Sequence, residues 1–357
     1  MAVLRVVLDQ ATDVVDPDQA EAARFLLVGL AATAPYRCTV EAIVPGGDPA
    51  AVFDGADTVH RLALGRREVG AAWQLGVIAG VGGGMIHAPS LFAPLAKHDR
   101  LHDNDQTVVT LWDLRAWTAP DQLSRTSVLW QRAMLKRAVK HADAVVVPTH
   151  AMAERLGDLA KLRDRIRVIP GAAPEGFAIP HDAPERRVAL GAPGRYLVAT
   201  GTAATLEPAF AAAIAADADA FVLDAPDGAA AAIAEAARAA GLDAPRVHVL
   251  GRPDVDDRAA LLGGAIALVA SDPAVAWPWR MLEALAIGVP VIAAEGGVHR
   301  DLLADGGLIV EGDGFTDAVH EAAGERARRL SVLAADRSRA YSWNGSAERV
   351  WALHADL

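Results

Sequence analysis

Short runs of β-branched and apolar residues alternate with alanine-rich stretches along nearly the whole of this 357-residue chain. Such runs, set between helical stretches, predict buried parallel strands covered by helices on both faces. The repeated scheme indicates two α/β halves of similar size. The predicted strands are 3–8, 39–44, 84–88, 107–111, 144–148 and 165–169 in the first half, and 195–200, 219–223, 246–250, 265–269, 289–293 and 307–310 in the second.

The alanine-rich stretches predict the helices. Several begin with Asp, Thr or Pro, which cap a helix N-terminus or fit its first turn. The predicted helices include 18–33, 125–141, 150–161, 227–240, 256–263 and 278–287.

Proline and glycine are densest from Pro170 to Pro180, near the midpoint, and predict the linker between two domains. The balance of basic and acidic side chains also changes near this linker. Residues 1–177 carry 19 basic and 20 acidic side chains, whereas residues 178–357 carry 15 and 25. Most of the formal net charge of −11 therefore belongs to the second half. This acidic balance argues against a nucleic-acid partner.

The cellular compartment can be predicted from the cysteine content and from the stretches that lack charged residues. Cys38 is the single cysteine, and no Cys/His cluster typical of zinc is present, which favours a reducing cytosol. The first ten residues contain Arg5 and Asp9, so they indicate a buried strand rather than an export signal. Residues 69–96 lack Asp, Glu, Lys and Arg, but their glycines and prolines do not suit a membrane span. We therefore predict a cytoplasmic protein.

The predicted helix 125–141 allows two interpretations. Its basic side chains, with Trp130 and Met134, could dock on the inner face of an anionic membrane, giving peripheral contact at most. A solvated basic helix face explains the same pattern. The basic side chains are Arg125, Arg132, Lys136, Arg137, Lys140 and His141. Two further histidines, His87 and His150, are expected at strand ends that face a cleft between the domains. A lone histidine there is more often a local hydrogen-bond partner, and contact with an acceptor is the other interpretation.

A set of segments follows a common order and spacing through both halves. They are 86–90, 108–114, 117–120, 142–151, 165–170, 196–202, 246–251, Leu282-Glu-Ala-Leu-Ala-Ile-Gly-Val-Pro-Val291 and 341–343. Together they resemble the retaining GT-B glycosyltransferases of glycosyltransferase family 4, especially the actinobacterial mannosyltransferase-like members. The resemblance covers nearly the whole chain.

The resemblance implies a GT-B fold, in which two Rossmann-like domains face each other across a cleft. Residues 1–175 would form the acceptor domain and residues 176–342 the nucleotide-sugar domain. Residues 343–357 would form a helix that crosses back to the first domain.

The implied reaction is retaining transfer of a hexosyl unit, of mannosyl type, in glycan or cell-envelope synthesis. The donor would be a GDP- or UDP-hexose and the acceptor a glycan or a lipid-linked hydroxyl. The resemblance implies no metal and no other cofactor, because cationic side chains and helix N-termini stabilise the leaving diphosphate. We therefore expect Asp254-Val-Asp-Asp257 to be a helix N-cap and first turn rather than a metal motif.

The positions that match the family segments give the residues of the candidate site. Glu283 corresponds to the family glutamate that holds the nucleotide ribose, because one carboxylate can accept from two adjacent hydroxyls; a glutamate on a solvated helix is the other interpretation. Gly201, Thr202 and Arg252 follow predicted strands and would contact the nucleotide sugar. Asp113 is retained at a strand end of the first domain and is a candidate catalytic residue.

The donor site departs from the family pattern. Val275 replaces the first family glutamate, and Ala276 and Pro278 replace glycines that let backbone amides approach phosphate. Residues 203–210 contain no Arg or Lys where the family grips the diphosphate, and Trp112 replaces the family histidine. The first βα turn also lacks its glycine pair. The sequence therefore predicts a degenerate donor site.

Arg280, at the predicted start of a helix, could replace the missing cations and so act in catalysis. A surface arginine lying over Trp277 or Trp279 explains its position equally well. Two functions follow from the sequence. One is an active, metal-independent glycosyltransferase. The other is a catalytically inactive GT-B protein that serves as partner or scaffold of an active glycosyltransferase subunit.

Overall fold

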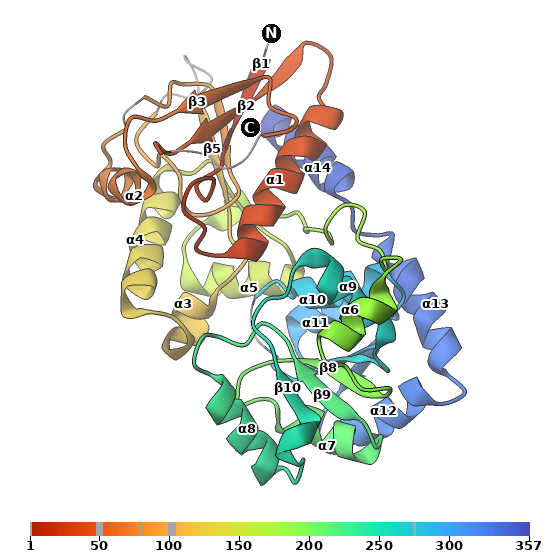
Figure 1. The fold of residues 1–357 in the computed structure, drawn as a ribbon. Coiled ribbons are helices and arrows are strands. Elements are labelled where there is room, and N and C mark those ends of the chain that lie inside the picture. The colour runs from red at the N-terminus through yellow and green to blue at the C-terminus, as the bar shows by residue number, and fades with distance from the viewer. Residues whose placement is uncertain (1, 48–52, 79, 99–104, 274–275) are drawn as a thin grey trace. The chain divides into compact units, whose positions relative to one another are not determined.

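A computed structural model describes residues 2–47, 53–78, 80–98, 105–273 and 276–357. The chain divides into two compact units, each with its own parallel sheet (Figure 1). Unit 1 comprises residues up to Pro174 together with Val275–Trp277 and Tyr341–Leu357, and unit 2 comprises Glu175–Ala274 and Pro278–Ala340.

Unit 1 contains a parallel sheet of seven strands in the order β3-β2-β1-β4-β5-β6-β7. The strands are β1 (Ala2–Val7), β2 (Cys38–Val44), β3 (Thr58–Arg61), β4 (Met85–Ala88), β5 (Gln106–Thr110), β6 (Ala144–Val147) and β7 (Ile166–Val168). The predicted strands of this half are confirmed, but β3 was missed. Its four residues are all exposed, so the apolar pattern that marks a buried strand is absent there.

The described helices of unit 1 are α1 (Pro17–Ala32), α2 (Arg66–Leu75), α3 (Arg115–Thr118), α4 (Arg125–His141), α5 (His150–Leu159) and α14 (Trp343–Asp356). Although α1 and α14 lie at opposite ends of the sequence, they pack side by side (Figure 1). Gly29 makes this approach possible, because a Cβ there would lie 2.8 Å from the Trp343 carbonyl oxygen. The last helix is therefore part of the core of unit 1.

Unit 2 contains a parallel sheet of six strands in the order β10-β9-β8-β11-β12-β13. These strands are β8 (Tyr196–Thr200), β9 (Asp219–Val222), β10 (Val247–Val249), β11 (Leu268–Ala270), β12 (Val291–Ala294) and β13 (Leu308–Val310). Its described helices are α6 (Ala183–Ala189), α7 (Glu207–Ala215), α8 (Ala230–Ala239), α9 (Val255–Gly264), α10 (Trp279–Ala286), α11 (Gly297–Leu303), α12 (Phe315–Ala323) and α13 (Ala327–Ser338).

The six strands predicted for the second half are all present, and they pack into an alanine-rich core. The N-cap prediction at Asp254 is confirmed: its side chain accepts from the Asp257 backbone N–H at 2.8 Å at the start of α9. Both sheets, with their interleaved helices, are Rossmann-like.

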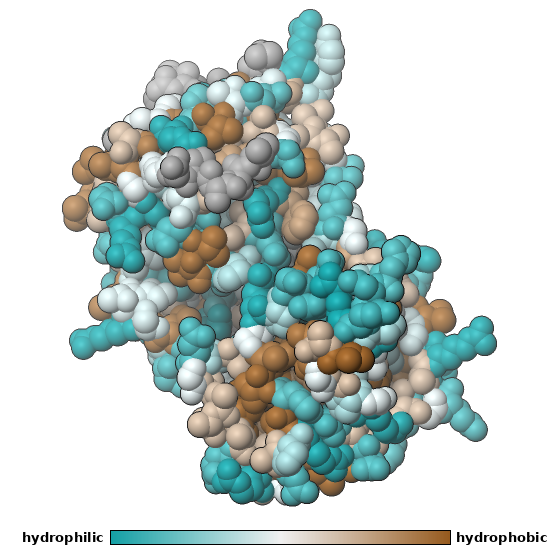
Figure 2. Space-filling model, in the orientation of Figure 1, coloured by the Kyte–Doolittle hydropathy of each residue, from teal (hydrophilic) through white to brown (hydrophobic). Residues whose placement is uncertain are grey.

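No helix in the described part of the chain is both long enough and apolar enough to span a membrane. Over the described part of the face in view, hydrophilic residues cover most of the surface and hydrophobic ones form separate patches (Figure 2).

His87 lies near the end of β4 as expected, and its Nε2 lies 3.4 Å from Thr110 Oγ1, but the side chain does not reach the surface and so does not face a cleft. Its side chain is buried in β4 against His354 of α14, with ring centroids 5.7 Å apart. His354 Nδ1 lies 3.0 Å from Gln106 Oε1, whereas His354 Nε2 and His87 Nδ1 have no hydrogen-bond partner among the described residues. Burial lowers the pKa of His354 to about 4 and that of His87 well below its usual value. Both imidazoles are therefore neutral in the folded protein.

This histidine pair should make unit 1 sensitive to acid. In the unfolded chain each histidine binds a proton below about pH 6.5, whereas in the folded chain neither does until the pH is much lower. The free energy of unfolding is thus highest above pH 6.5 and falls toward pH 4, by on the order of 3 kcal/mol for His354 alone. Urea unfolding at pH 7, 6 and 5 should show this fall, and His354→Leu should make it smaller by the share that His354 contributes, leaving that of His87. An equal fall in the variant would exclude the histidine as its source.

Candidate functional site

The strand order of unit 2 reverses between β8 and β11, and ligands of open parallel sheets bind at the carboxyl ends of strands at such a reversal. Gly201 and Thr202 directly follow β8, and Ser271 directly follows β11. Because Thr200 pairs with Ala270, the two turns begin side by side. This edge of the sheet is the candidate nucleotide-sugar site.

The turn after β8 requires its glycine. Gly201 has φ of +156°, and a Cβ there would lie 2.9 Å from Thr205 Oγ1. The same hydroxyl accepts a hydrogen bond from the Thr202 backbone N–H at 2.9 Å. The turn thus supplies its own hydrogen-bond partner at Thr202.

Ser271 is a candidate residue that the sequence analysis missed. It is 6% exposed, and its Oγ has no hydrogen-bond partner among the described residues. Buried hydroxyls are almost always paired, so an unpaired one at a sheet reversal suits a ligand. Its position two residues after the predicted strand 265–269 was the available signal.

Glu283 lies in the middle of α10 and is 1% exposed, so it does not lie on a solvated helix face. Its carboxylate is held by Arg258 of α9, which is fully buried, with Arg258 Nη2 to Glu283 Oε1 at 2.9 Å and Nε to Oε2 at 3.2 Å. Arg280 also donates to Glu283 Oε1. Two guanidinium groups therefore share one buried carboxylate.

Arg280 is 4% exposed, so the surface-arginine interpretation was wrong. Besides Glu283, it forms an ion pair with Asp224, whose Oδ2 lies 2.9 Å from Arg280 Nε. Asp224 follows β9, and Arg252 follows β10 in a half-buried position. The positive charges of Arg258 and Arg280 equal in number the negative charges of Glu283 and Asp224. We call Asp224, Arg258, Arg280 and Glu283 the α10 network.

Val275, which stands where the family has its first glutamate, lies outside the described residues. The neighbouring residues Ala276 and Trp277 belong to unit 1. The Trp277 backbone N–H donates to the Trp112 carbonyl oxygen at 2.8 Å, and Ala276 forms an antiparallel bridge with Asp113. Ala276 and Trp277 therefore pair with Asp113 and Trp112, which follow β5 in unit 1.

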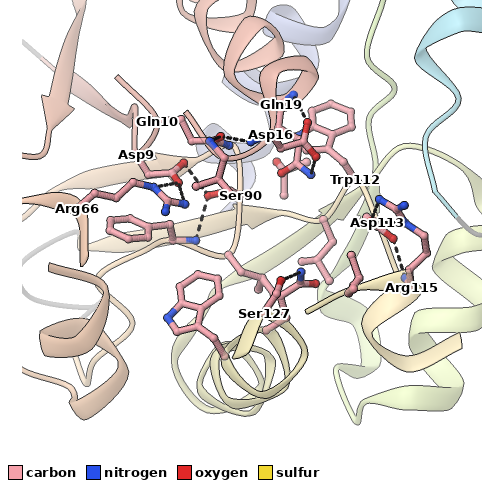
Figure 3. A pocket seen from close by; sticks show the side chains of 18 residues that line it. Asp9, Gln10, Asp16, Gln19, Arg66, Ser90, Trp112, Asp113, Arg115 and Ser127 are labelled. Carbon is pink, nitrogen blue, oxygen red and sulfur yellow. Dashed lines mark hydrogen bonds and ion pairs between the residues drawn. The ribbon is translucent and has the colours of Figure 1, made fainter. Parts of the chain in front are cut away.

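Unit 1 has a cavity of about 210 Å³ at the carboxyl ends of β1, β4 and β5 (Figure 3). The sheet order reverses between β1 and β4, so the cavity lies where a Rossmann-like sheet binds ligands. Its polar lining includes residues of the first βα turn and of α4. The polar residues of the whole lining are Asp9, Gln10, Asp16, Gln19, Arg66, Ser90, Thr110, Asp113, Arg115, Ser127 and Gln131. We call this space the unit 1 cavity.

Two ion pairs lie in the wall of the unit 1 cavity. Asp9 Oδ2 accepts from Arg66 Nη2 at 3.0 Å, and Asp9 Oδ1 accepts from Ser90 Oγ at 3.1 Å. Burial raises the pKa of Asp9, while the Arg66 charge opposes that rise. Asp113 Oδ2 accepts from Arg115 Nε at 2.7 Å, so this candidate catalytic residue lies in the wall. Across the described residues, no His, Cys, Asp and Glu side chains gather in a group suited to a metal ion.

No family model and no curated protein matches this chain. Several solved structures are similar to it. Sucrose-phosphate synthase from Thermosynechococcus elongatus is similar with a TM-score of 0.71 and 19% identity, covering 100% of this chain and 99% of that one. Anabaena HepE in complex with UDP and glucose gives 0.66 and 16%, covering 100% of both chains. WaaG, a glycosyltransferase involved in lipopolysaccharide biosynthesis, gives 0.62 and 13%, covering 98% of both.

These similarities extend over the whole of both chains and therefore concern both units. At identities below a fifth they show the fold alone. The chain has the fold of the GT-B glycosyltransferases.

Proposed function

We propose that the chain transfers a hexosyl unit from a nucleotide sugar to a hydroxyl acceptor with retention, as a mannosyl-type enzyme of glycan or cell-envelope synthesis. The observation that carries this proposal is the correspondence of fold over the full length of HepE, a protein solved with UDP and glucose. Sequence resemblance supports the mannosyl type and the retaining course. The nucleotide sugar would bind to unit 2.

The proposed roles follow the sheet edge of unit 2. Gly201 and Thr202 would approach the diphosphate, Arg252 the base and Glu283 the ribose. Arg280 would leave Asp224 for the diphosphate, whose charge its guanidinium matches in geometry. In unit 1, Asp113 would lie near the acceptor.

Ligand-induced stabilisation tests this proposal. A ligand that binds only the folded state raises stability by RT ln(1 + [L]/Kd), about 2.7 kcal/mol at a hundred times Kd. We expect millimolar UDP or GDP to raise the melting temperature, with ADP as the comparison. No rise with any of the three would contradict the proposal.

Asp224→Asn should tighten binding of that nucleoside diphosphate roughly fivefold. The change removes one charge that competes for Arg280, worth about 1 kcal/mol between solvated charges at contact. Asp227→Asn, an exposed change in the same loop, is the control and should leave Kd unchanged. Calorimetric titration measures both. A Kd that rises in Asp224→Asn would contradict the assignment of Arg280 to the diphosphate.

The α10 network favours the second function that the sequence suggested. Its four charges balance within unit 2, and residues 203–210 add no cation. A chain with this network could serve as a catalytically inactive partner of an active glycosyltransferase subunit. Binding of a nucleoside diphosphate without turnover of GDP-mannose or a UDP-hexose would favour this function.

A further inference from the structure

The second half of α4 has two exposed cations, Lys136 and Lys140. The apolar side chains that the sequence places beside them lie elsewhere, because Met134 is fully buried and Trp130 lines the unit 1 cavity. Leu129 of α4 is exposed, but a single exposed apolar side chain needs no explanation. A docking surface here therefore needs apolar side chains from another element.

The C-terminal end of α2 supplies these apolar side chains. Leu75 is 80% exposed, Val77 57% and Ile78 44%. Figure 2 shows hydrophobic residues over α2, at the left edge of the view. Three exposed apolar side chains within four residues are typical of an interaction surface rather than of a surface that only water contacts.

Cations lie beside this end of α2. A Cβ at Gly76 would lie 2.6 Å from Arg137 Nη2, so the Arg137 guanidinium packs against the end of the helix. Ile78, Lys97 and His98 line a cavity of about 590 Å³ at the amino ends of β4 and β5. The exposed Lys97 is therefore a neighbour of the apolar side chains.

The cations of α4 belong to the same surface. Burial lowers the pKa of His141, and the positive charges of Arg137, His98 and Lys140 lower it further. Lys136 directly precedes Arg137 and is exposed. We call this surface the α2 edge patch; its members are Leu75, Val77, Ile78, Lys97, Lys136, Arg137 and Lys140.

Two carboxylates, Asp105 and Asp143, lie near His98, and both are engaged in the fold. Asp143 is 5% exposed and accepts from His98 Nε2 at 2.9 Å and from the Thr107 backbone N–H at 2.7 Å. Asp105 accepts from the Gly84 backbone N–H. Residues 1–177 as a whole carry 19 basic and 20 acidic side chains. The α2 edge patch is thus a local excess of positive charge on a nearly neutral unit.

The α2 edge patch lies at the edge of the unit 1 sheet opposite to the unit 1 cavity. Helix α2 begins at Arg66, which lines that cavity at the carboxyl ends of the strands, and ends at Leu75. Helix α4 likewise contributes Gln131 to the cavity and Lys140, more than two turns later, to the patch. What binds the patch is therefore not the ligand of the cavity.

We propose that the α2 edge patch docks unit 1 on an anionic lipid surface. Leu75, Val77 and Ile78 enter the boundary between headgroups and acyl chains, and the cations beside them contact lipid phosphates. Lysine supplies three of the four cations, and lysine is depleted at interfaces between proteins but favoured beside anionic lipid. This inference goes beyond the proposed function and does not depend on it, because docking needs no nucleotide sugar.

Co-sedimentation of the full chain with lipid vesicles tests the docking. The vesicles contain phosphatidylcholine alone or phosphatidylcholine mixed with phosphatidylglycerol. We expect at least tenfold tighter binding to the anionic vesicles, because each lysine near an anionic surface contributes about fivefold. Salt should weaken this binding, because it screens exposed charges. Equal binding to both vesicles would overturn the proposal, and absence of binding to either would overturn it in favour of a partner protein.

Lys136→Gln combined with Lys140→Gln tests the cations. This double variant should bind the anionic vesicles at least tenfold more weakly than the parent. Arg238→Gln combined with Arg339→Gln is the matched control, because it removes the same charge from exposed positions of unit 2. The control should bind within about twofold of the parent. An equal loss in the two double variants would assign binding to net charge alone and overturn the proposal.

Leu75→Asn tests the apolar part of the patch. It should weaken binding to the anionic vesicles at least fivefold, because a leucine side chain no longer passes from water into lipid. Val332→Asn, a change at a 62% exposed position of α13, is the control and should bind as the parent does. Both variants should keep the urea midpoint of the parent, since exposed side chains contribute little to folding. If Leu75→Asn binds as tightly as Val332→Asn, the apolar side chains do not enter the lipid and the proposal fails.

Discussion

Glu283→Ala is expected to lower the free energy of unfolding of unit 2 by about 3–5 kcal/mol. Arg258 and Arg280 are both buried, and without Glu283 a buried guanidinium loses the carboxylate that neutralises it. Breaking a buried ion pair by removing one partner costs this much because the remaining charge stays desolvated. Circular dichroism in urea should show a lower midpoint, and hydrogen exchange should locate the loss in unit 2.

Glu235→Ala is the matched control. Glu235 pairs with Arg238 on the surface of α8, where water screens both charges, so its urea midpoint should stay within error of the parent. A midpoint for Glu283→Ala no lower than that of this control would contradict the assignment of Glu283 to a buried network.

Trp351→Ala is expected to destabilise unit 1 by about 3–5 kcal/mol, as for other large-to-small changes of buried aromatic residues. Trp351 lies on α14 and is buried. Its Nε1–H donates to the Leu30 carbonyl oxygen of α1 at 3.0 Å. The change opens a cavity and leaves that carbonyl without its donor. Tryptophan fluorescence in urea can follow the loss, because most of the tryptophans belong to unit 1.

Arg349→Ala, an exposed change on the same helix, controls for altered helix propensity. It should leave the midpoint nearly unchanged. If Trp351→Ala unfolds at the same urea concentration as Arg349→Ala, α14 does not contribute to the core of unit 1.

The sequence predicted twelve of the strands in the described chain, because most of them are buried on both faces and such burial leaves continuous apolar runs. It missed β3, an exposed edge strand with no such run. It also placed His87 at a cleft, because a single sequence cannot show that residue 354 packs against residue 87. Distant packing of this kind leaves no local pattern.

The candidate site was predictable only in part. The positions of Gly201, Thr202 and Arg252 after strands were predictable, and the carboxyl ends of parallel strands are where such sheets bind ligands. The partners of Arg280 and Glu283 were not predictable, since Asp224 and Arg258 lie on other elements and no spacing links them. The unit 1 cavity was missed for the same reason, because its wall combines five separate segments: the first βα turn, Arg66, Ser90 with Phe92, the end of β5, and α4.

Calorimetric titration of UDP and GDP into the parent protein and Arg280→Ala tests the central claim most directly. Arg280→Ala leaves Glu283 paired with Arg258, so unit 2 should remain folded. Loss of a charge-assisted contact is worth about 1.5–3 kcal/mol, or at least tenfold in Kd. We predict saturable binding of one nucleoside diphosphate by the parent and at least tenfold weaker binding by the variant. Absence of binding to the parent, or equal binding by both, would contradict it.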